Sequence, residues 1–196
     1  MVIRLAACCL LLAACTFSGS VKPTVKVGLS APFEGLYRDL GYEALYAVRL
    51  AVRQRNEGGG VGGRYLVELV ALNDFNEAEE AVRQAREMAV DPGILGVLGG
   101  WSPNVAHAAV PEYDQLGLAF LAPEVDFTGS QPSSPVVEQV EFFAEYRALS
   151  GGAPPGSAAV WAYAEANRLL DALDAAARAE KRPTRAGVLA ALGTTR

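Results

Sequence analysis

Between residues 25 and 122, segments with strand-like spacing of apolar residues alternate with segments with helix-like spacing. Four short segments are mostly apolar or alternate apolar with polar positions, as strands do: residues 25–29, 65–72, 94–98 and 118–122. The segments between them space apolar side chains three or four positions apart, as helices do: residues 42–56, 76–90 and 102–116. This alternation predicts an α/β fold with a parallel sheet, right-handed connections and flanking helices.

Two of these segments allow a finer prediction. Residues 65–72 are mostly apolar, which is typical of a strand that is buried on both faces of its sheet. Residues 76–90 gather charged side chains on one side, so the other side is expected to pack inward. The expected inward stripe consists of Ala78, Val82, Ala85 and Ala89. A loop is expected over residues 30–41.

The pattern changes after residue 126. Residues 127–136 are rich in Gly, Ser and Pro and predict a linker. Beyond it we expect a helical C-terminal segment that packs back on the α/β lobe, with helices near residues 137–149 and 158–180 and a last helix capped by Thr184. The predicted parts are a leader (residues 1–14), a tether (15–24), an α/β lobe (25–126), a linker (127–136) and a helical segment (137–196).

The first fifteen residues have the pattern of a lipoprotein signal peptide. Arg4 precedes an apolar run from Leu5 to Ala14, and small residues come directly before Cys15. We therefore predict cleavage before Cys15, acylation of its thiol and a lipid-anchored protein of the cell envelope that faces the periplasm or the exterior. The tetrapeptide Leu-Ala-Ala-Cys that ends at Cys15 also ends at Cys8, but too few residues precede that copy to form an apolar segment. The apolar run is too short for a membrane-spanning helix. The alternative to an exported lipoprotein is a cytosolic protein whose first residues happen to be apolar.

Cysteine content and charge argue against several functions. All three cysteines lie at Cys15 or before it, so the rest of the chain has no thiol for a disulfide, a nucleophile or a zinc site. Arg4 is the only one of the 17 basic residues in the leader, so 16 basic and 22 acidic residues remain after cleavage. This acidic balance argues against a nucleic-acid partner.

The most promising binding site is the run Gly99-Gly100-Trp101-Ser102-Pro103. It joins a predicted strand to a predicted helix, and open parallel sheets bind ligands at such junctions. The backbone of Gly100 and Trp101, together with Ser102 and the free N–H groups of the helix, is expected to hold an anionic group. Ser102 before Pro103 is equally an ordinary N-cap, and both roles stay open.

Acidic and aromatic residues give weaker signals. Asp74 follows the second predicted strand, and Glu124 and Asp126 follow the fourth. These carboxylates, Asp126 above all, are candidates to meet an ammonium group, although most loop carboxylates are simply solvated. Trp161 and Tyr163 are interpreted as core anchors rather than as a stacking platform.

Catalytic and cofactor motifs are matched only in part. The run from Gly100 departs from the nucleophile elbow G-x-S-x-G at Asn104, and the single histidine, His107, lies on the same helix. Gly58, Gly60 and Gly63 fit G-x-G-x-x-G, but they follow a helix and precede a strand, the reverse of a dinucleotide site. No spacing indicates metal ligands. We therefore expect no catalytic residues, no cofactor and no metal.

The order of these features resembles one family. From Val25 to Pro123 the chain is similar to the start of a leucine-type (branched-chain amino acid) periplasmic binding protein, a solute receptor of ABC importers. The residues that carry the resemblance are Val25–Gly28, Pro32, Gly35, Gly41, Glu43–Leu45, Leu50–Val52, Asn56–Arg64, Asp74, Ala81, Val82, Ile94–Gly99, Ser102, Pro111, Gly117, Pro123, Phe143–Arg147, Pro154, Pro155 and Ala159–Tyr163. The resemblance implies a type I, Rossmann-like lobe, an amino-acid-like ligand and an ABC permease as partner, and it matches the family's ligand-binding serine to Ser102.

A second lobe is missing from this resemblance. In the family it lies between the counterparts of Pro123 and Phe143, where this chain has only the linker and one turn of helix. The family's aromatic residue in the first loop falls on Leu40. We therefore expect a single-lobe solute-binding protein. The alternatives are a tethered interaction module, whose exposed face serves self-association or a partner that supplies the second lobe, and an internally deleted receptor remnant.

Overall fold

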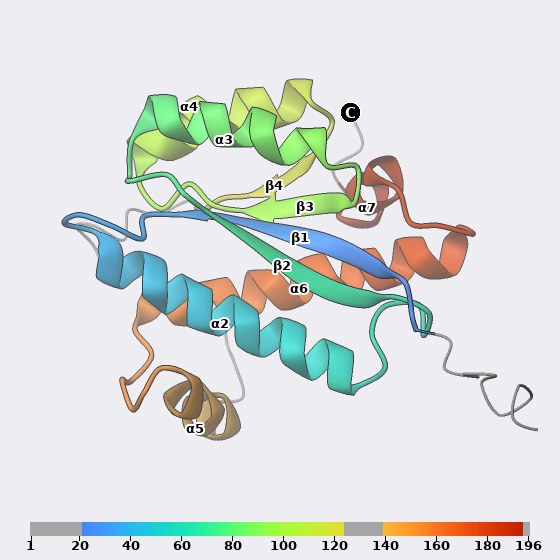
Figure 1. Ribbon diagram of the computed structural model, residues 1–196, viewed down its shortest axis with the longest axis horizontal. Coiled ribbons are helices and arrows are strands. Elements are labelled where there is room, and N and C mark those ends of the chain that lie inside the picture. Colours follow the sequence, from blue (N-terminus) through green and yellow to red (C-terminus); the bar gives the residue numbers. More distant parts are fainter. Residues whose placement is uncertain (1–20, 124–138, 194–196) are drawn as a thin grey trace, which may run out of the picture.

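The computed structural model describes residues 21–123 and 139–193. They form a four-stranded parallel sheet with helices on both faces, followed by further helices (Figure 1), which confirms the predicted fold class. The strands are β1 (Thr24–Ala31), β2 (Leu66–Asn73), β3 (Ile94–Leu98) and β4 (Ala119–Leu121). The helices are α2 (Arg38–Glu57), α3 (Ala78–Val90), α4 (Pro103–Gln115), α5 (Gln139–Leu149), α6 (Ser157–Ala179) and α7 (Arg185–Ala191). Cys15, Glu124 and Asp126 lie outside the described residues.

The strand order is β2-β1-β3-β4, and each neighbouring pair is parallel. β1 and β2 pair over their full length, from Thr24 opposite Leu66 to Ala31 opposite Asn73. Because all four strands run the same way, their carboxyl ends meet at one edge of the sheet, on the left of Figure 1. We call this the carboxyl edge and the opposite one the amino edge.

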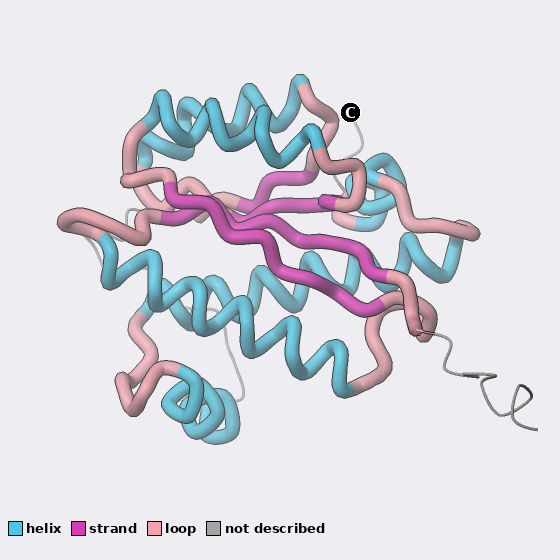
Figure 2. Tube along the Cα trace, in the orientation of Figure 1, coloured by secondary structure: helices cyan, strands magenta, loops and turns pink. Residues whose placement is uncertain are grey.

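Helices cover both faces of the sheet, α2 and α6 on one and α3 and α4 on the other (Figure 2). The core has two corresponding clusters of buried side chains. Helices α2 and α6 contribute many small, fully buried side chains to the larger cluster: Ala44, Ala47, Ala51, Ala159 and Ala162. Small side chains allow two helices to approach each other closely, so α6 fits beside α2 under the sheet.

Polar contacts fasten the C-terminal helices to the amino edge. The Arg185 guanidinium donates at 2.8–3.0 Å to three backbone carbonyl oxygens, those of Ala89, Asp91 and Ile94. The Asp174 carboxylate accepts from the Gly62 N–H at 2.8 Å. The Thr184 hydroxyl accepts from the Gly187 N–H at 3.1 Å, so the predicted cap of the last helix is confirmed. The C-terminal segment is therefore part of the same folded unit as the sheet.

Residues 65–72 are not buried on both faces, so that prediction is wrong. β2 lies at the end of the strand order, with a neighbour on one side only. Val67 is buried, whereas Glu68 and Ala71 are exposed and the other side chains of β2 are half-buried. An apolar strand at the side of the sheet and an apolar strand at its centre have the same sequence pattern. The pattern does not show which strands lie beside it.

The inward side of α3 is rotated from the predicted stripe. Its buried residues are Ala81, Gln84, Ala85 and Met88, whereas Ala78, Val82 and Ala89 are half-buried. The predicted stripe contained apolar residues only, whereas the polar Gln84 is buried because its side chain is hydrogen-bonded. The predicted loop over residues 30–41 is also shorter, since β1 continues to Ala31 and α2 begins at Arg38.

Glu43 of α2 stabilises the start of α6. Burial raises the pKa of its carboxyl group, while the backbone N–H groups of Ala159 and Gly156 bind the carboxylate and act in the opposite direction. Negative charge is favourable at a helix N-terminus because the N–H groups there are unpaired. A Cβ atom at Gly156 would lie 2.4 and 2.5 Å from the two carboxylate oxygens. Glycine at this position therefore leaves room for the contact.

We expect Gly156→Ala to lower the free energy of unfolding by about 1 kcal/mol, because the new methyl group displaces the Glu43 carboxylate from the helix terminus. Urea denaturation measures the loss. The double variant with Glu43→Ala should lose no more than the worse single variant, since both remove one contact. Gly58→Ala is the control, because a Cβ atom there meets nothing closer than 3.4 Å. Additive losses would contradict the role of Glu43.

Candidate functional site

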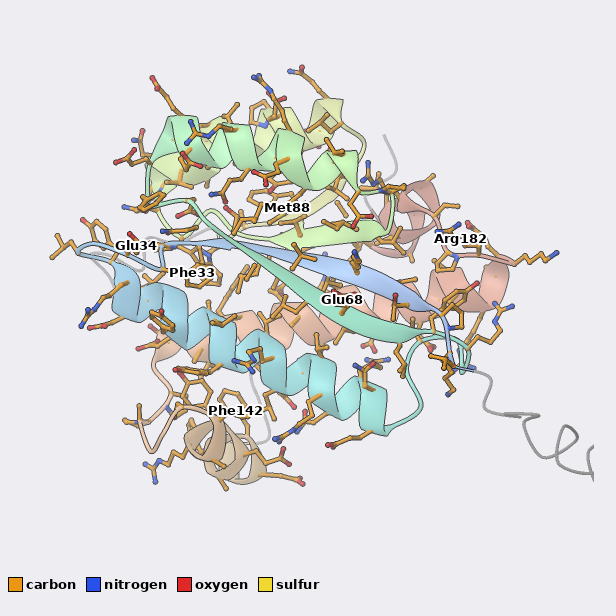
Figure 3. The ribbon with its side chains drawn as sticks, in the orientation of Figure 1. Phe33, Glu34, Glu68, Met88, Phe142 and Arg182 are labelled. Carbon is orange, nitrogen blue, oxygen red and sulfur yellow. The ribbon has the colours of Figure 1, made fainter. Side chains whose placement is uncertain are left out.

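The loops that follow the strands converge at the carboxyl edge. They are residues 32–37, 74–77 and 99–102, and each leads into a helix whose N-terminus faces this edge. Phe33 and Glu34 lie at this end of the molecule, whereas Met88 lies between α3 and the sheet (Figure 3). Parallel α/β sheets bind ligands beyond the carboxyl ends of their strands, so this is the edge to examine for a site.

Gly100 forms the tight turn between β3 and α4. Its φ of +75° lies in the left-handed region that favours glycine. A Cβ atom there would lie 3.0 Å from the Ala122 Cβ and 3.1 Å from the Ala106 Cβ. The preceding Gly99 N–H donates to the Leu121 carbonyl oxygen at 3.1 Å, which joins the turn to β4. A Cβ atom at Gly99 would lie 2.9 Å from the Phe120 ring and 3.0 Å from the Ser30 carbonyl oxygen, so both positions favour glycine.

The Trp101 side chain belongs to the core. It is 1% exposed, and its indole Nε1–H donates to the Ser30 carbonyl oxygen at 2.8 Å. Its ring packs edge-on against Trp161 with centroids 5.3 Å apart. Trp161 is partly buried against the larger cluster, in agreement with its interpretation as a core anchor. The Trp101 side chain is thus committed to the core and is not a ligand contact.

Ser102 occupies the N-cap position of α4, but its hydroxyl does not cap the helix. The hydroxyl donates instead to the Asn76 Oδ1 at 2.7 Å. Among the described residues, the N–H groups of Asn104 and Val105 have no acceptor, whereas the Ala106 N–H donates to the Ser102 carbonyl oxygen at 2.9 Å. The ordinary capping role of the Ser102 side chain is therefore wrong, and the start of α4 keeps free N–H donors.

Residues 73–76 form the turn that brings Asn76 to Ser102. The Asn73 Oδ1 accepts from the N–H of Phe33 at 2.8 Å and of Phe75 at 3.1 Å, which connects the first and second loops. Phe75 and Asn76 have φ values of +52° and +60°, which are unfavourable for residues other than glycine. Strained backbone of this kind is concentrated at ligand-binding loops. Asn73 and Asn76 were missed in the sequence, where only the tolerance of Asn for left-handed backbone could have indicated them.

Asp74 is fully buried, so the expectation of a solvated loop carboxylate is wrong for this residue. Its Oδ2 lies 3.0 Å from the Ser30 Oγ, and its Oδ1 accepts from the Asn76 N–H at 2.9 Å. Burial raises the pKa of Asp74, although the hydrogen bond from the Asn76 N–H acts in the opposite direction. The side chain points into the lobe and fixes the turn from the interior through its bond to the Asn76 N–H.

Together these groups place unpaired N–H donors at the same edge of the sheet as exposed apolar side chains. The donors are the free N–H groups at the start of α4 and the Asn76 amide nitrogen, which has no acceptor among the described residues. Leu36 and Phe75 lie on the loops of the same edge and are 88% and 44% exposed. Such an arrangement can bind a small molecule that has both an acidic group and an apolar part.

A histidine, a metal-ligand cluster or a membrane-spanning helix would each indicate another kind of site. His107 is exposed on α4. Residues 21–123 and 139–193 contain no group of three His, Cys, Asp or Glu side chains that could hold a metal ion. Within the same ranges, none of the helices combines the length and the apolar character needed to cross a bilayer.

The fold and the turn at the start of α4 are typical of the ligand-binding lobes of α/β proteins. The family model of the periplasmic binding proteins matches residues 24–138, and the chain belongs to this family. The Leu/Ile/Val-binding protein homolog 7 of Brucella melitensis is 29% identical over 96 residues, which are 49% of this chain and 24% of that protein. The matched stretch is thus about a quarter of the length of this relative.

Two solved structures share the fold. One is a Rhodospirillum rubrum protein assigned to a branched-chain amino acid ABC transporter, with a TM-score of 0.72 at 17% identity, covering 86% of this chain and 88% of the other. The other is the substrate binding protein LivJ of the branched-chain amino acid transporter of Streptococcus pneumoniae, in complex with isoleucine. Its TM-score is 0.70 at 12% identity, and 88% of each chain is covered. The predicted membership of the periplasmic binding proteins is therefore confirmed by the family match, and these two structures show the same fold.

We expect Gly100→Ala to lower the free energy of unfolding by about 2 kcal/mol, since it adds a crowded methyl group to a backbone with positive φ. Gly117→Ala is the matched control: its φ is +63°, but a Cβ atom there meets nothing within 4 Å. The control should lose only about 1 kcal/mol, the backbone part. Thermal denaturation compares the two variants. Equal losses would mean that the turn at Gly100 is not tightly packed.

Proposed function

We propose that this protein is a lipid-anchored, extracytoplasmic solute-binding protein that binds a small amino-acid-like ligand at the carboxyl edge and catalyses no reaction. The observation that carries the proposal is the contact between Ser102 and Asn76 beside the uncapped start of α4, in a lobe of the periplasmic binding protein family. The Brucella relative is named for leucine, isoleucine and valine, and the S. pneumoniae structure holds isoleucine. A branched-chain amino acid is therefore the first ligand to test.

Each part of such a ligand has a proposed partner. The backbone of Gly100 and Trp101, the free N–H groups of α4 and the Asn76 amide would bind the ligand carboxylate. The Ser102 oxygen keeps its lone pairs, because its proton is donated to Asn76, so it can accept from the ligand's ammonium group. We also assign the ammonium group to Asp126, which lies outside the described residues. Leu36 and Phe75 would contact the apolar side chain.

A single lobe covers only one side of a ligand. Tight small-molecule sites bury most of the ligand surface, so we expect weak affinity unless a second surface closes over the site. An ABC permease, a second copy of this chain or a separate chain that supplies the second lobe could provide that surface. The exposed Leu36 and Phe75 also favour a second candidate function, a tethered interaction module that uses the same edge for a protein partner.

Thermal denaturation with added amino acids tests the proposal. Leucine, isoleucine or valine at about 100 times its dissociation constant should add about 2.7 kcal/mol to the free energy of unfolding. Isopentylamine, which is leucine without its carboxylate, should give no shift. A cooperative transition that no amino acid shifts would favour the interaction module, and the absence of a cooperative transition would favour a receptor remnant.

Ser102→Ala should reduce ligand affinity, whereas Thr184→Ala should reduce stability. Ser102→Ala removes a hydroxyl that does not cap its helix, so we expect at least a tenfold loss of leucine affinity, about 1.4 kcal/mol, with little loss of stability. Thr184→Ala removes a true cap at the amino edge and should lower the free energy of unfolding by about 1 kcal/mol with no change in affinity. Calorimetric titration and urea denaturation measure both quantities. Loss of stability alone in Ser102→Ala would overturn the ligand role.

Lipid attachment can be tested at Cys15. We expect Cys15→Ser to abolish labelling of the protein by a radioactive fatty acid in the producing bacterium and to release it from the membrane fraction. Cys8→Ser is the control, because Cys8 precedes the proposed cleavage site and should not affect labelling. Labelling that persists in Cys15→Ser, or disappears in Cys8→Ser, would contradict the proposed anchor.

A further inference from the structure

We propose that Asp74 is a neutral, hydrogen-donating carboxylic acid in the folded protein and that this acid, bound to Ser30 and to the Asn76 N–H, positions the turn which carries Asn76 to Ser102. Only the consequence for ligand affinity rests on the proposed function. The protonation state and its effect on stability are properties of the lobe itself.

The argument begins with the single proton of the Ser30 hydroxyl. The Ser30 Oγ lies 3.0 Å from the Asp74 Oδ2 and 3.2 Å from the Gln84 Oε1. A carbonyl oxygen and an ionised carboxylate are both acceptors, and one hydroxyl proton cannot satisfy both. All three side chains are buried, so an acceptor left without a donor loses its hydrogen bonds to water without replacement.

The orientation of the Gln84 amide decides which group supplies the missing proton. Its Nε2 donates to the Asn73 carbonyl oxygen and, at 3.3 Å, to the Glu80 Oε1. Both partners are acceptors, so a reversed amide would place oxygen against oxygen on that side. The Gln84 Oε1 therefore faces Ser30 and receives the Ser30 proton. The Asp74 Oδ2 must then donate to the Ser30 Oγ, which requires a protonated carboxyl group.

The electrostatic surroundings favour the same state. From α4, the buried Tyr113 hydroxyl donates to the Met88 Sδ at 3.7 Å, and burial raises the pKa of this tyrosine, so it brings no charge to the surroundings of Asp74. From α3, Glu80 lies behind Gln84 and pairs with the exposed Arg83. Within the described residues no Lys, Arg or His side chain pairs with Asp74. A buried negative charge at this position would therefore have no counter-ion.

Protonation of Asp74 leaves the turn intact. In the neutral acid, Oδ2 donates to Ser30 while Oδ1 remains an acceptor for the Asn76 N–H at 2.9 Å. That bond holds the backbone of Asn76, whose side chain accepts from Ser102. Ionisation would turn the Ser30 hydroxyl toward Asp74 and leave the Gln84 oxygen without a donor. Asp74 is thus a positioning residue for the proposed ligand contacts.

The variant Asp74→Asn distinguishes a protonated Asp74 from an ionised Asp74 that has only a structural role. The asparagine amide reproduces the neutral acid, with a donor toward Ser30 and an acceptor toward the Asn76 N–H. A group whose pKa is raised on folding stabilises the protein at low pH and loses this contribution as the pH rises through its folded pKa. We therefore expect the melting temperature of wild type to fall, relative to Asp74→Asn, by roughly 2–4 °C or more between about pH 5 and about pH 8.

Asp174→Asn is the matched control with the opposite sign. The hydrogen bond from Arg178 lowers the pKa of Asp174, so its contribution is present at neutral pH and is lost as the pH falls. Asp174→Asn should therefore be less stable than wild type at neutral pH, with a difference that shrinks in acid. The same behaviour in Asp74→Asn, or failure of this variant to fold, would overturn the proposal.

Carbon-13 NMR of the carboxyl groups gives a direct reading. The Asp74 resonance is the one that Asp74→Asn removes, and its titration midpoint should lie well above the ordinary aspartate value. A midpoint at or below that value would overturn the proposal. The leucine affinity of wild type should weaken as this resonance titrates, while that of Asp74→Asn stays level. If no amino acid binds at any pH, the proposed function fails, whereas the NMR and stability results still decide the protonation state.

Discussion

The contact between α2 and α6 brings the second half of the chain under the sheet. Alanines on both helices allow them to lie close together, and Glu43 of α2 binds the N-terminus of α6 where Gly156 leaves room for it. Without α6, one face of a parallel sheet would lose a large part of its cover, and such sheets are stable only when both faces are covered. The fold therefore depends on a long-range contact that neither helix could make alone.

The carboxyl edge is built on buried polar groups rather than on the exposed residues around it. Ser30, Gln84 and Asp74 lie inside the lobe and hold the turn at residues 73–76 from behind. The positive φ values of Phe75 and Asn76 are unfavourable by themselves and persist because the surrounding hydrogen bonds fix them. The position of the Asn76 side chain next to Ser102 is thus determined by residues that a ligand at the edge would not touch.

Much of the fold could be predicted from the period of the hydrophobic pattern, because the type of element is recorded locally in the sequence. The edge position of β2 and the burial of Gln84 could not be predicted, because both depend on neighbours that are distant in the chain. For the site, the turn at Gly100 followed from its place between a strand and a helix. The partner of Ser102 did not, since Asn76 reaches it only through a strained turn 26 residues earlier in the sequence.

The direction of β1 also sets how an anchored lobe would be oriented. β1 is the first described strand, and it runs from the amino edge to the carboxyl edge over 8 residues. A strand of this length spans about 26 Å. If the lobe is held at a membrane by its N-terminal end, the carboxyl edge, where we propose the ligand to bind, would face away from the membrane, and the amino edge, which Arg185 contacts, would face toward it. In an anchored molecule, the parallel arrangement of the strands would thereby set which end of the lobe faces away from the membrane.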